Sequence, residues 1–583
     1  MIQVKMFILF TFLFTIAFSS DDIEINLKGQ GKLRGSRNQV ARNGQHYHQF
    51  LGIPYAEPPV GELRFRNPVP VTSWDDIMDA TAPSPPCIQS SFLPLFGSED
   101  CLTLNVFTKD LTFRRPVLVY LHSGAFISGS ISGNTGEFLM EQDIVLVTVQ
   151  YRLGPMGWLT SGDSEAPGNY GLQDQILALR WVQQHIESFG GDKDSVTLAG
   201  FSSGAASVNY LLLSPLTAGL FHRGVAMSGS ALSWWASLDN LENTSIKLAQ
   251  AVSCPEKPSA DMISCLQKVP AEELLQAQSK FYHGILEPLT IWSPRIDIEA
   301  GEGSVVPLEP AIAMVEGRSQ SVPFLVGVTQ SEGAFFAANY LTQDEVMTKF
   351  LDEFDQEAQI ALGLKHYIKD EDMTEALKKI KSFYLGTLHR DTDFQKMLDN
   401  FVNGMIEMFG DAMFNYAIDS MIKFQSGQAH SPVWVYQYNY KHNHSLVSLD
   451  LRNPGQIRKA GFKQLEQPSH GHESSMLFPE YEGLLGPLSE EETKYSRKFI
   501  KFIVNFMRSG QPKIGNKDEF KYWKPVIEES PSHYEHGEKS SIRQSLPFQN
   551  RMKFWGTLPI KWRKSLFDHM TDKFKDMREN DEL

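Results

Sequence analysis

The sequence predicts an α/β fold: a large, mostly parallel central sheet flanked by helices, with helical insertions. The run IVLVTVQ (144–150) is almost continuously apolar, as in a strand that is buried on both faces. An amphipathic helical pattern covers Asp174–Phe189 and stops at Gly190-Gly191, and a second buried strand follows at Val196–Ala199. Strand, helix and strand in this order are typical of a parallel sheet.

The remaining elements fit one domain over residues 20–583. Further strands are expected at Leu104–Phe107, Pro116–Leu121, Phe324–Val328 and Val433–Tyr440. Residues 344–424 and 495–507 have helical periodicity, and the second of these helices ends at Ser509-Gly510. The proline-rich segment Phe50–Pro68 is expected to be an ordered loop. Because no Gly/Ser- or Pro-rich linker divides the chain, we expect insertions on one sheet rather than separate domains.

Composition excludes some classes of function. The chain has 583 residues, of which 42% are hydrophobic and 21% charged, as in an ordinary globular protein with a large core. The formal net charge of -15 disfavours nucleic acid as a partner.

The N-terminus predicts a signal peptide over residues 1–19. Lys5 supplies a positive charge, and the apolar stretch Met6–Phe18 is too short to span a bilayer comfortably. Ala17-Phe18-Ser19 offers small residues at the cleavage position. An uncleaved anchor is the alternative. No later stretch is long and apolar enough for a membrane helix, so no transmembrane anchor is expected.

The cysteines and sequons are consistent with secretion. The four cysteines are Cys87, Cys101, Cys254 and Cys265. In an oxidising compartment an even number suggests two disulfides, and three pairings are open. Pairing of neighbours closes two short loops without any long-range coincidence. Asn243 and Asn443 begin glycosylation sequons, although such triplets are also common by chance.

The segment Gly200-Phe201-Ser202-Ser203-Gly204 is a GxSxG pattern. In a nucleophile elbow, a strand leads through a sharp, strained turn into a helix, and the serine stands at the turn. The context fits, because an apolar strand precedes Ser202 and small residues follow it. A side chain at either glycine would crowd the turn, and the helix N-terminus would offer N–H groups to an oxyanion. The alternative is a small-residue turn without chemistry, since the motif alone is weak.

Several longer segments give this motif a family context. They are GIPYAEPPVGELRF (52–65), SEDCLTLNV (98–106), YRLGPMGWL (151–159), GNYGLQDQILALRWVQQHIESFGGD (168–192) and MSGSAL (227–232). In this order they resemble the type-B carboxylesterases, the carboxylesterase and cholinesterase branch of the α/β-hydrolase fold. The resemblance covers nearly the whole mature chain. It implies that fold, esterase activity without a cofactor and both local disulfides; a further disulfide of cholinesterases has no counterpart here.

The resemblance also implies a catalytic triad. Ser202 matches the nucleophile, Glu332 in GVTQSEG (327–333) matches the acid, and His470 in SHGHE (469–473) matches the base. The order Ser, Glu, His is that of α/β-hydrolases. A serine hydroxyl is a poor nucleophile at neutral pH, so an imidazole must take its proton. A carboxylate must orient the imidazole and stabilise its charged form.

Two alternatives concern the histidines. His472 lies two residues after His470 and is the rival base. The two could also form a metal pair, with His442 and His444 nearby in the sequence. No HExxH or comparable spacing supports zinc, so no metal is expected.

The oxyanion hole is expected at two backbone segments. His122-Ser123-Gly124-Ala125-Phe126 stands where the family usually has HGGGF, so Gly124 and Ala125 match two N–H donors. Ser203, which follows the nucleophile, matches the third. The sequence departs from the family at Ser123, Ala125 and Ser203. Each of these residues retains its N–H, so the departures affect the size of the pocket more than its competence.

The substrate is expected to be a neutral ester with an apolar acyl group. Cholinesterases have a Trp between their first two cysteines, which contacts a quaternary ammonium group. The corresponding loop here, Ile88–Asp100, is short and has no Trp. Trp235 resembles the acyl-pocket Trp of the family.

We therefore expect a serine carboxylic-ester hydrolase that acts on small-molecule esters through an acyl-enzyme intermediate. One alternative is a catalytically inactive, neuroligin-like adhesion protein, which would be marked by loss of the serine; Ser202, Glu332 and His470 are all present. Another is a specialised hormone esterase with the same chemistry.

The last four residues, Asn580-Asp581-Glu582-Leu583, are close to the KDEL retrieval address. We expect a protein of the secretory pathway, either kept in the endoplasmic reticulum lumen by a retrieval receptor or secreted. A polar frayed terminus is the alternative, because Asn580 departs from the standard address.

Overall fold

The computed structural model describes residues 22–581 except 91–94, 283–287, 387–393, 429–430, 445–446, 448–462, 481, 514–522 and 528–530. The expected signal peptide, residues 1–19, and the last two residues, Glu582 and Leu583, lie outside the described residues. Among the helices in the described ranges, none combines the length and apolarity that a membrane crossing requires.

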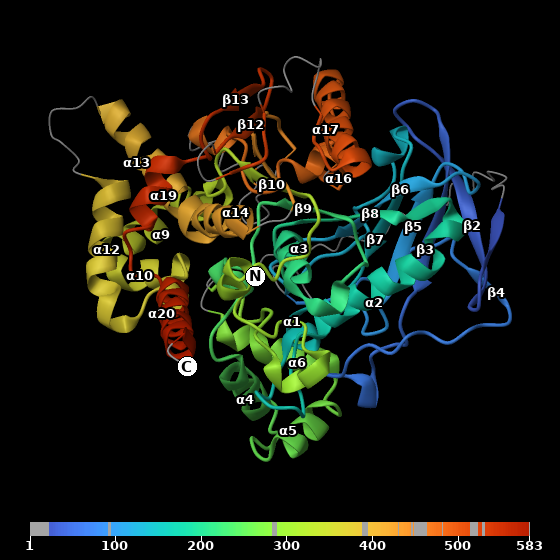
Figure 1. Ribbon diagram of the computed structural model, residues 1–583, viewed down its shortest axis with the longest axis horizontal. Helices are drawn as coiled ribbons and strands as arrows, with labels where there is room; N and C mark the ends of the chain where they lie inside the picture. The colour runs from blue at the N-terminus through green and yellow to red at the C-terminus, as the bar shows by residue number, and fades with distance from the viewer. Residues whose placement is uncertain are drawn as a thin grey trace, which may run out of the picture.

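The described chain forms a 13-stranded sheet (Figure 1). The first strands are β1 (Ile23–Leu27), β2 (Gly31–Gln39), β3 (His46–Pro54), β4 (Ile77–Asp79) and β5 (Thr103–Thr108). The central strands are β6 (Arg115–Leu121), β7 (Val145–Val149), β8 (Gly191–Phe201), β9 (Arg223–Met227), β10 (Phe324–Thr329) and β11 (Val433–Tyr438). The last two are β12 (His533–His536) and β13 (Ser541–Arg543).

The centre of this sheet is parallel, as the sequence predicts. The spatial order is β1-β2-β3-β5-β7-β6-β8-β9-β10-β11-β12-β13, with β4 beside β2. Every neighbouring pair from β7 to β12 in this order is parallel. The pairs before β7 along this path, and the final β12–β13 pair, are antiparallel. The carboxyl ends of the central strands therefore share one edge, where the site described below is built.

Successive side chains of the central strands enter two different cores. In β6, Val119 and Leu121 belong to one core and Tyr120 to the other, as the two-residue period of a strand requires. The sheet therefore separates two apolar layers. The covering helices are α2 (Tyr170–His185) and α3 (Ser203–Leu213) in the first layer and α17 (Glu490–Ser509) in the second.

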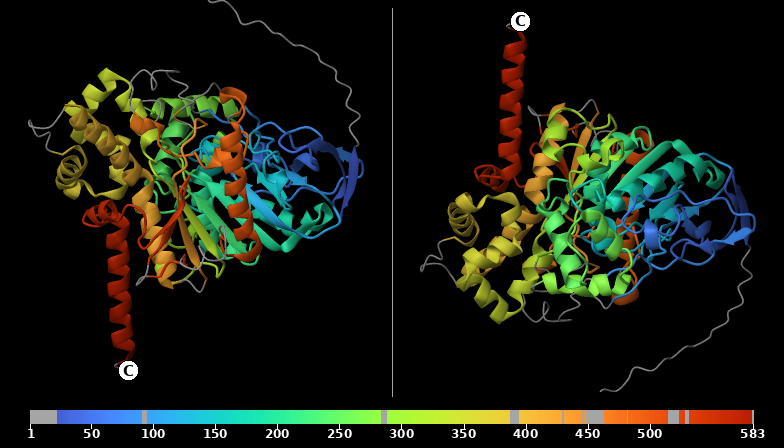
Figure 2. Two further views of the ribbon diagram at one scale, coloured as in Figure 1. Left: turned by 90° about the horizontal axis from the view of Figure 1, so that it is seen from above. Right: turned by 90° about the horizontal axis from the view of Figure 1, so that it is seen from below.

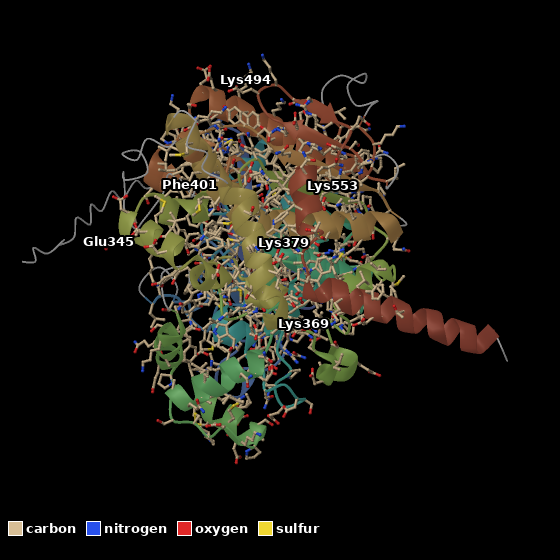
Figure 3. All side chains as sticks on the ribbon, turned by 90° about the vertical axis from the view of Figure 1, so that its left-hand side faces the viewer. Glu345, Lys369, Lys379, Phe401, Lys494 and Lys553 are labelled. Atoms are coloured by element: carbon tan, nitrogen blue, oxygen red, sulfur yellow. A yellow bond between two sulfur atoms is a disulfide. The ribbon has the colours of Figure 1, made fainter. Side chains whose placement is uncertain are left out.

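The other helices are inserted between or after the strands. They are α1 (Gly154–Trp158), α4 (Leu241–Ala251), α5 (Ser259–Leu266), α6 (Ala271–Gln278), α7 (Pro310–Val315), α8 (Ala334–Leu341), α9 (Asp344–Asp352), α10 (Phe354–Ala361), α11 (Leu364–Tyr367), α12 (Asp370–Leu385), α13 (Phe394–Gly410), α14 (Tyr416–Gln428), α16 (Glu482–Leu485), α19 (Gln549–Trp555) and α20 (Lys561–Asp581). Figure 3 shows the insertion side, with Lys379 on α12 and Phe401 on α13. Helix α20 extends away from the body of the molecule (Figure 2).

Residues 344–424 are largely helical, as expected, but not as one uniform run. A π-helix, Asp411–Asn415, joins α13 to α14. Short π-helical segments within α-helices occur frequently at functional sites.

The prediction of a loop over Phe50–Pro68 is wrong for its first five residues. Phe50–Pro54 belong to β3, because Phe50 pairs with Val106 and Ile53 with Leu104 of β5. A register shift separates these two pairs. Hydrogen bonding to a neighbouring strand thus extends the strand up to Pro54.

Two helices begin earlier than their apolar periodicity indicates. Helix α2 starts at Tyr170, not Asp174. Helix α17 starts at Glu490, not Tyr495, because Ser489 and Glu492 form a capping box: the Ser489 hydroxyl accepts from the Glu492 N–H and the Glu492 carboxylate from the Ser489 N–H. The first turn of α17 is acidic and carries no apolar periodicity, so the sequence pattern missed it; the first turn of α2 contains Gly171, a poor helix former.

Candidate active site

The turn at Ser202 has the geometry of a nucleophile elbow. Ser202 stands between β8 and α3 with φ 57° and ψ −118°, a strained conformation for a residue with a side chain. A Cβ at Gly200 would collide with the Gly204 backbone, and one at Gly204 with the Leu121 carbonyl. The expectation that neither glycine tolerates a side chain is confirmed.

Ser202, His470 and Glu332 form one hydrogen-bonded chain. The Nε2 atom of His470 lies 2.9 Å from the Ser202 Oγ, and its Nδ1 atom lies 2.8 Å from the Glu332 Oε2. The exposed fractions are 9% for Ser202, 4% for His470 and 1% for Glu332. A buried imidazole that bridges a hydroxyl and a carboxylate can move a proton from the one while the other stabilises its positive charge.

The Glu332 carboxylate is held by its own turn. It follows β10, and its Oε1 atom accepts hydrogen bonds from the Thr329 N–H at 2.7 Å and the Ser228 hydroxyl at 2.6 Å. Ser228, directly after β9, has φ 55°. Ser202, Ser228 and Glu332 thus follow the ends of three neighbouring strands, β8, β9 and β10.

A second buried carboxyl group, Glu473, lies behind the first. Its Oε1 atom is 3.2 Å from the Ser228 Oγ, and its Oε2 atom accepts from the Tyr436 hydroxyl at 2.6 Å. Burial raises the pKa of Glu473 to about 8, with the nearby Glu332 charge acting in the same direction and the Tyr436 hydrogen bond against it. The group is therefore protonated at neutral pH.

With Glu473 protonated, the hydrogen bonds can all run in one direction, from Glu473 to Ser228 and from Ser228 to Glu332. Ser228 has a single hydroxyl proton, and its shorter contact is with Glu332. A protonated Glu473 donates to Ser228 in turn. No sequence pattern indicates this role for Glu473, although it lies in the same SHGHE segment as His470.

His472 does not contact Ser202. Its Nδ1 atom accepts from the Ser469 N–H at 2.9 Å, and its ring lies 4.6 Å from the ring of His442. Burial lowers the pKa of His472 to about 4. The structure thus brings His470, and not the rival His472, to the serine.

Three backbone N–H groups lie in the segments expected to form the oxyanion hole. Those of Gly124, Ala125 and Ser203 donate no hydrogen bond to the described chain, and Gly124 and Ala125 have φ 122° and 53°. The Tyr151 hydroxyl links the two segments: it donates to the His122 carbonyl at 2.7 Å and lies beside the Ser203 hydroxyl. These three N–H groups therefore have no competing acceptor among the described residues.

Aromatic rings surround the imidazole of His470. Phe414, in the π-helix, stacks on it at 4.1 Å between ring centres, Phe201 lies at 4.7 Å and Phe336 at 6.1 Å. No pattern in the sequence predicts that these three rings lie next to His470; Phe201 stands out only as part of the GxSxG segment. Phe414 in particular depends on how the π-helix turns, which apolar periodicity does not reveal.

Trp235, the expected acyl-pocket residue, is buried in the same aromatic group. Its indole N–H donates to the Met413 carbonyl at 2.8 Å. Its ring lies 5.8 Å from Phe414 and 6.2 Å from Phe126, the residue after Ala125. The π-helix therefore contacts both His470 and Trp235.

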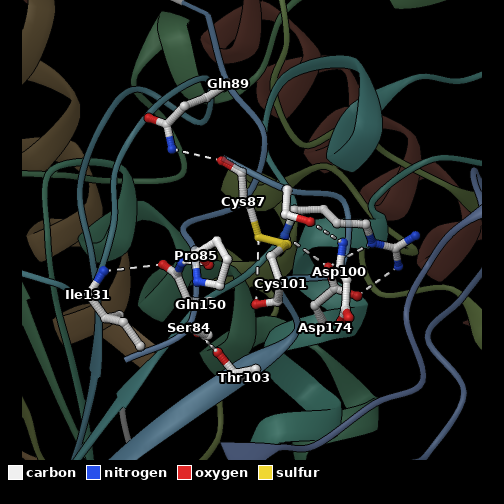
Figure 4. The surroundings of a disulfide bond; sticks show 12 residues. Ser84, Pro85, Cys87, Gln89, Asp100, Cys101, Thr103, Ile131, Gln150 and Asp174 are labelled. Carbon is white, nitrogen blue, oxygen red and sulfur yellow. Dashed lines mark hydrogen bonds and ion pairs between the residues drawn. A yellow bond between two sulfur atoms is a disulfide. The ribbon is translucent and has the colours of Figure 1, made fainter. Parts of the chain in front are cut away.

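Both local disulfides are present, Cys87–Cys101 and Cys254–Cys265. The first lies beside Gln89, whose side-chain amide donates to the Cys87 carbonyl at 2.9 Å (Figure 4). Each bond closes a short loop. The sequon residues Asn243 and Asn443 are both exposed.

Comparisons with known proteins give a consistent result. Residues 21–555 match the profile of the carboxylesterase family. A protein of Bombus ignitus described as a carboxylic ester hydrolase is 32% identical over 515 residues, which are 84% of this chain and 88% of that protein. The juvenile hormone esterase of Tribolium castaneum is 35% identical over 70% of this chain and 71% of its own. Liver carboxylesterase 1 of Oryctolagus cuniculus is 31% identical over 92% of each chain.

Proposed function

Since the chain belongs to the carboxylesterase family and is a carboxylic ester hydrolase, we propose that Ser202, Glu332 and His470 are its catalytic triad. The observation that supports this most directly is the hydrogen-bonded chain through His470 at the strained turn. The nucleophile and the base are already within hydrogen-bond reach, which is the first geometric requirement for this chemistry.

The first half of the reaction forms an acyl-enzyme. The Ser202 Oγ attacks the ester carbonyl carbon while His470 Nε2 takes the hydroxyl proton. The carbonyl oxygen becomes an oxyanion, and the N–H groups of Gly124, Ala125 and Ser203 stabilise it. When the tetrahedral intermediate collapses, His470 gives its proton to the departing alcohol oxygen.

The second half returns the enzyme to its starting state. A water molecule attacks the acyl carbon while His470 Nε2 takes one of its protons. Collapse breaks the bond to Ser202, which regains a proton from His470, and the carboxylic acid leaves. The Glu332 carboxylate faces Nδ1 throughout and stabilises each imidazolium.

The proposed substrates are neutral esters with apolar acyl groups. The support is the aromatic group of Trp235, Phe414 and Phe336 next to the proposed base, which suits an apolar acyl group, and the lack of a Trp in the Ile88–Asp100 segment, where cholinesterases bind the quaternary ammonium group. The test compares kcat/KM for a nitrophenyl or naphthyl ester with that for butyrylthiocholine. A higher value for butyrylthiocholine would contradict the proposal.

Covalent labelling tests the nucleophile. An organophosphate should phosphorylate Ser202 in the wild-type protein, and mass spectrometry of the peptides locates the label. Ser203→Ala is the matched control, because it removes the neighbouring hydroxyl and leaves the nucleophile; it should be labelled at Ser202 like the wild type. Labelling that persists in Ser202→Ala, or that lies on Ser203, would contradict the assignment.

We further propose that the chain passes through the secretory pathway. Two disulfides are typical of proteins from oxidising compartments, and one relative, 30% identical, is named venom carboxylesterase-6 of Apis mellifera. Removal of the last four residues should increase secretion from cells if they are a retrieval address. Glycosidase treatment should lower the mass of the secreted protein, and Asn243→Gln and Asn443→Gln should each remove part of that difference. Equal secretion with and without the tail would exclude retrieval.

A further inference from the structure

We propose a metal-binding site for a divalent transition-metal ion such as Zn²⁺, formed by His442, His444 and Glu492 and separate from the triad. All three residues are buried, and one ligand atom of each lies within 4.8 Å of the other two. Imidazole nitrogen and carboxylate oxygen are ligands that Zn²⁺ takes in proteins. The two histidines are neighbours in the sequence, whereas Glu492 comes from α17, 48 residues after His444.

The two imidazoles are oriented as metal ligands usually are. His442 Nε2 lies 3.1 Å from the His472 carbonyl, and His444 Nε2 lies 2.8 Å from the Gly486 carbonyl. A carbonyl accepts only from an N–H, so the proton of each neutral ring sits on Nε2 and the lone pair on Nδ1. Donation of one ring N–H to a carbonyl is the arrangement that fixes the tautomer of a metal-bound histidine.

Neither Nδ1 atom has a strong hydrogen-bond donor among the described residues. His444 Nδ1 is buried and makes no hydrogen bond to the described chain, which is unusual for a buried polar atom. His442 Nδ1 accepts one long contact, 3.2 Å, from the His444 N–H. A metal ion would satisfy the unused lone pair of His444 and would replace the long contact at His442.

Glu492 presents its carboxylate from a fixed position. Its Oε2 atom accepts from the Ser489 N–H at 2.8 Å in the capping box of α17. Its Oε1 atom lies 3.6 Å from His444 Nδ1. Two ligands at about 2.0–2.1 Å in a tetrahedral site are about 3.4 Å apart, so this pair needs little adjustment. Two nitrogens and one oxygen leave a fourth position for water.

The site would join three segments, one of which carries the proposed base. His442 contacts the His472 carbonyl, two residues after His470. The Ser475 hydroxyl contacts both the His444 carbonyl, at 2.9 Å, and the His472 carbonyl, at 2.8 Å. A bound ion would therefore stabilise the loop around His470 and α17 together, without contacting the ester.

Metal binding is measured directly, without reference to activity. Full-length protein without a polyhistidine tag is stripped with a chelator and titrated with Zn²⁺ and with Co²⁺. We expect one tightly bound Zn²⁺ per chain, ligand-field absorption of four-coordinate Co²⁺, and a melting temperature that rises with Zn²⁺ concentration.

Two variants and one control locate the ion. Glu492→Gln preserves the capping box, since Gln also serves at that position, and should lower Zn²⁺ affinity by more than about 100-fold, beyond the usual cost of losing an outer-shell partner. His444→Ala should do the same; if it fails to fold, Glu492→Gln decides alone. His46→Ala, an exposed histidine of β3, should bind like the wild type.

Two results would overturn the proposal. One is a stripped wild-type protein that binds no stoichiometric Zn²⁺ and whose melting temperature does not respond to it. The other is equal Zn²⁺ binding by the wild type and a folded Glu492→Gln, which would place the ion elsewhere. In either case the pair His444–Glu492 would be a polar contact only.

Discussion

The proposed nucleophile, Ser202, and the proposed base, His470, are held in place by different means. Ser202 is positioned by its neighbours in sequence, a strand before it and a helix after it, with two glycines that leave room for the turn. His470 is positioned by distant groups: Glu332 is 138 residues away and Ser202 is 268. Near it, Glu473 contacts the side chains of Ser228, which follows β9, and of Tyr436, which lies within β11.

The two regions should therefore be sensitive to different kinds of substitution. At the elbow, the backbone conformation and the space around it decide function, so side-chain size matters more than polarity. At the base, a network of buried polar groups decides it, so the loss of one hydrogen bond leaves other groups without partners. The predictions below separate the two.

The largest loss of kcat is expected at Ser202 and His470, whose side chains contact each other. Ser202→Ala or His470→Ala should lower kcat for an ester by on the order of 10⁶-fold, as in other triads. His472→Ala should be far milder, because His472 contacts Ser469 and His442 instead. Steady-state kinetics with a nitrophenyl ester, with thermal melts of each variant, provide the measurement. A severe His472→Ala and a mild His470→Ala would reverse the assignment.

The next largest loss of kcat is expected in the hydrogen-bond network of Glu473, next to the proposed acid Glu332. Glu473→Ala should lower kcat by about 100-fold, the cost of a misplaced catalytic group, because Ser228 and Tyr436 lose a partner. Glu473→Gln keeps a neutral group of the same shape that can donate to Ser228, so its kcat should stay within about tenfold. If Gln is as damaging as Ala, the neutral acid is not what Glu473 supplies.

The same residue predicts how stability depends on pH. The pKa of Glu473 rises from 4.5 to about 8 on folding, so between these values the folded state holds a proton that the unfolded state has lost. Its contribution to stability is complete below pH 4.5 and is lost as the pH passes about 8. Relative to the wild type, the melting temperature of Glu473→Gln should therefore rise across this window. Parallel melting curves for the two proteins would contradict the raised pKa.

The smallest effect is expected at the elbow. Ser203→Ala keeps the backbone N–H, so kcat should remain within about tenfold, a barrier change of about 1.4 kcal/mol. Tyr151→Phe, which removes the hydroxyl that contacts His122, is the companion variant. A folded Ser203→Ala slowed by about 10²–10³-fold, the cost of a lost oxyanion donor, would show that the hydroxyl itself takes part.

Features of this molecule that depend on neighbouring residues could be predicted from the sequence, and features that depend on contacts between distant segments could not. The buried central strands and the elbow could be recognised from short segments, because apolar runs and glycine spacing are local. Strand β2 was not predicted, since Leu33 is its one large apolar residue and pairing with β1 and β3 defines it. The positions of Glu332 and His470 were expected only through family motifs, because nothing local brings them together.

The features that the sequence did not reveal are those made by contacts between distant segments. The role of Glu473 depends on Tyr436, within β11, and on Ser228, after β9, which are far apart in the sequence. Phe414 reaches His470 because the helix changes to π geometry, which has no periodic apolar pattern. In the same way, Glu492 meets His444 only through the placement of α17.

The two disulfides have a consequence for proteolysis. Each closes a loop in which both chain ends remain covalently joined if a peptide bond inside the loop is cut. The loop from Cys254 to Cys265 includes the exposed residues Glu256 and Lys257, a place where a protease can reach the backbone. A cut there would separate no fragment until the sulfurs were reduced, so a nicked enzyme would migrate as one chain on a non-reducing gel and as two on a reducing gel.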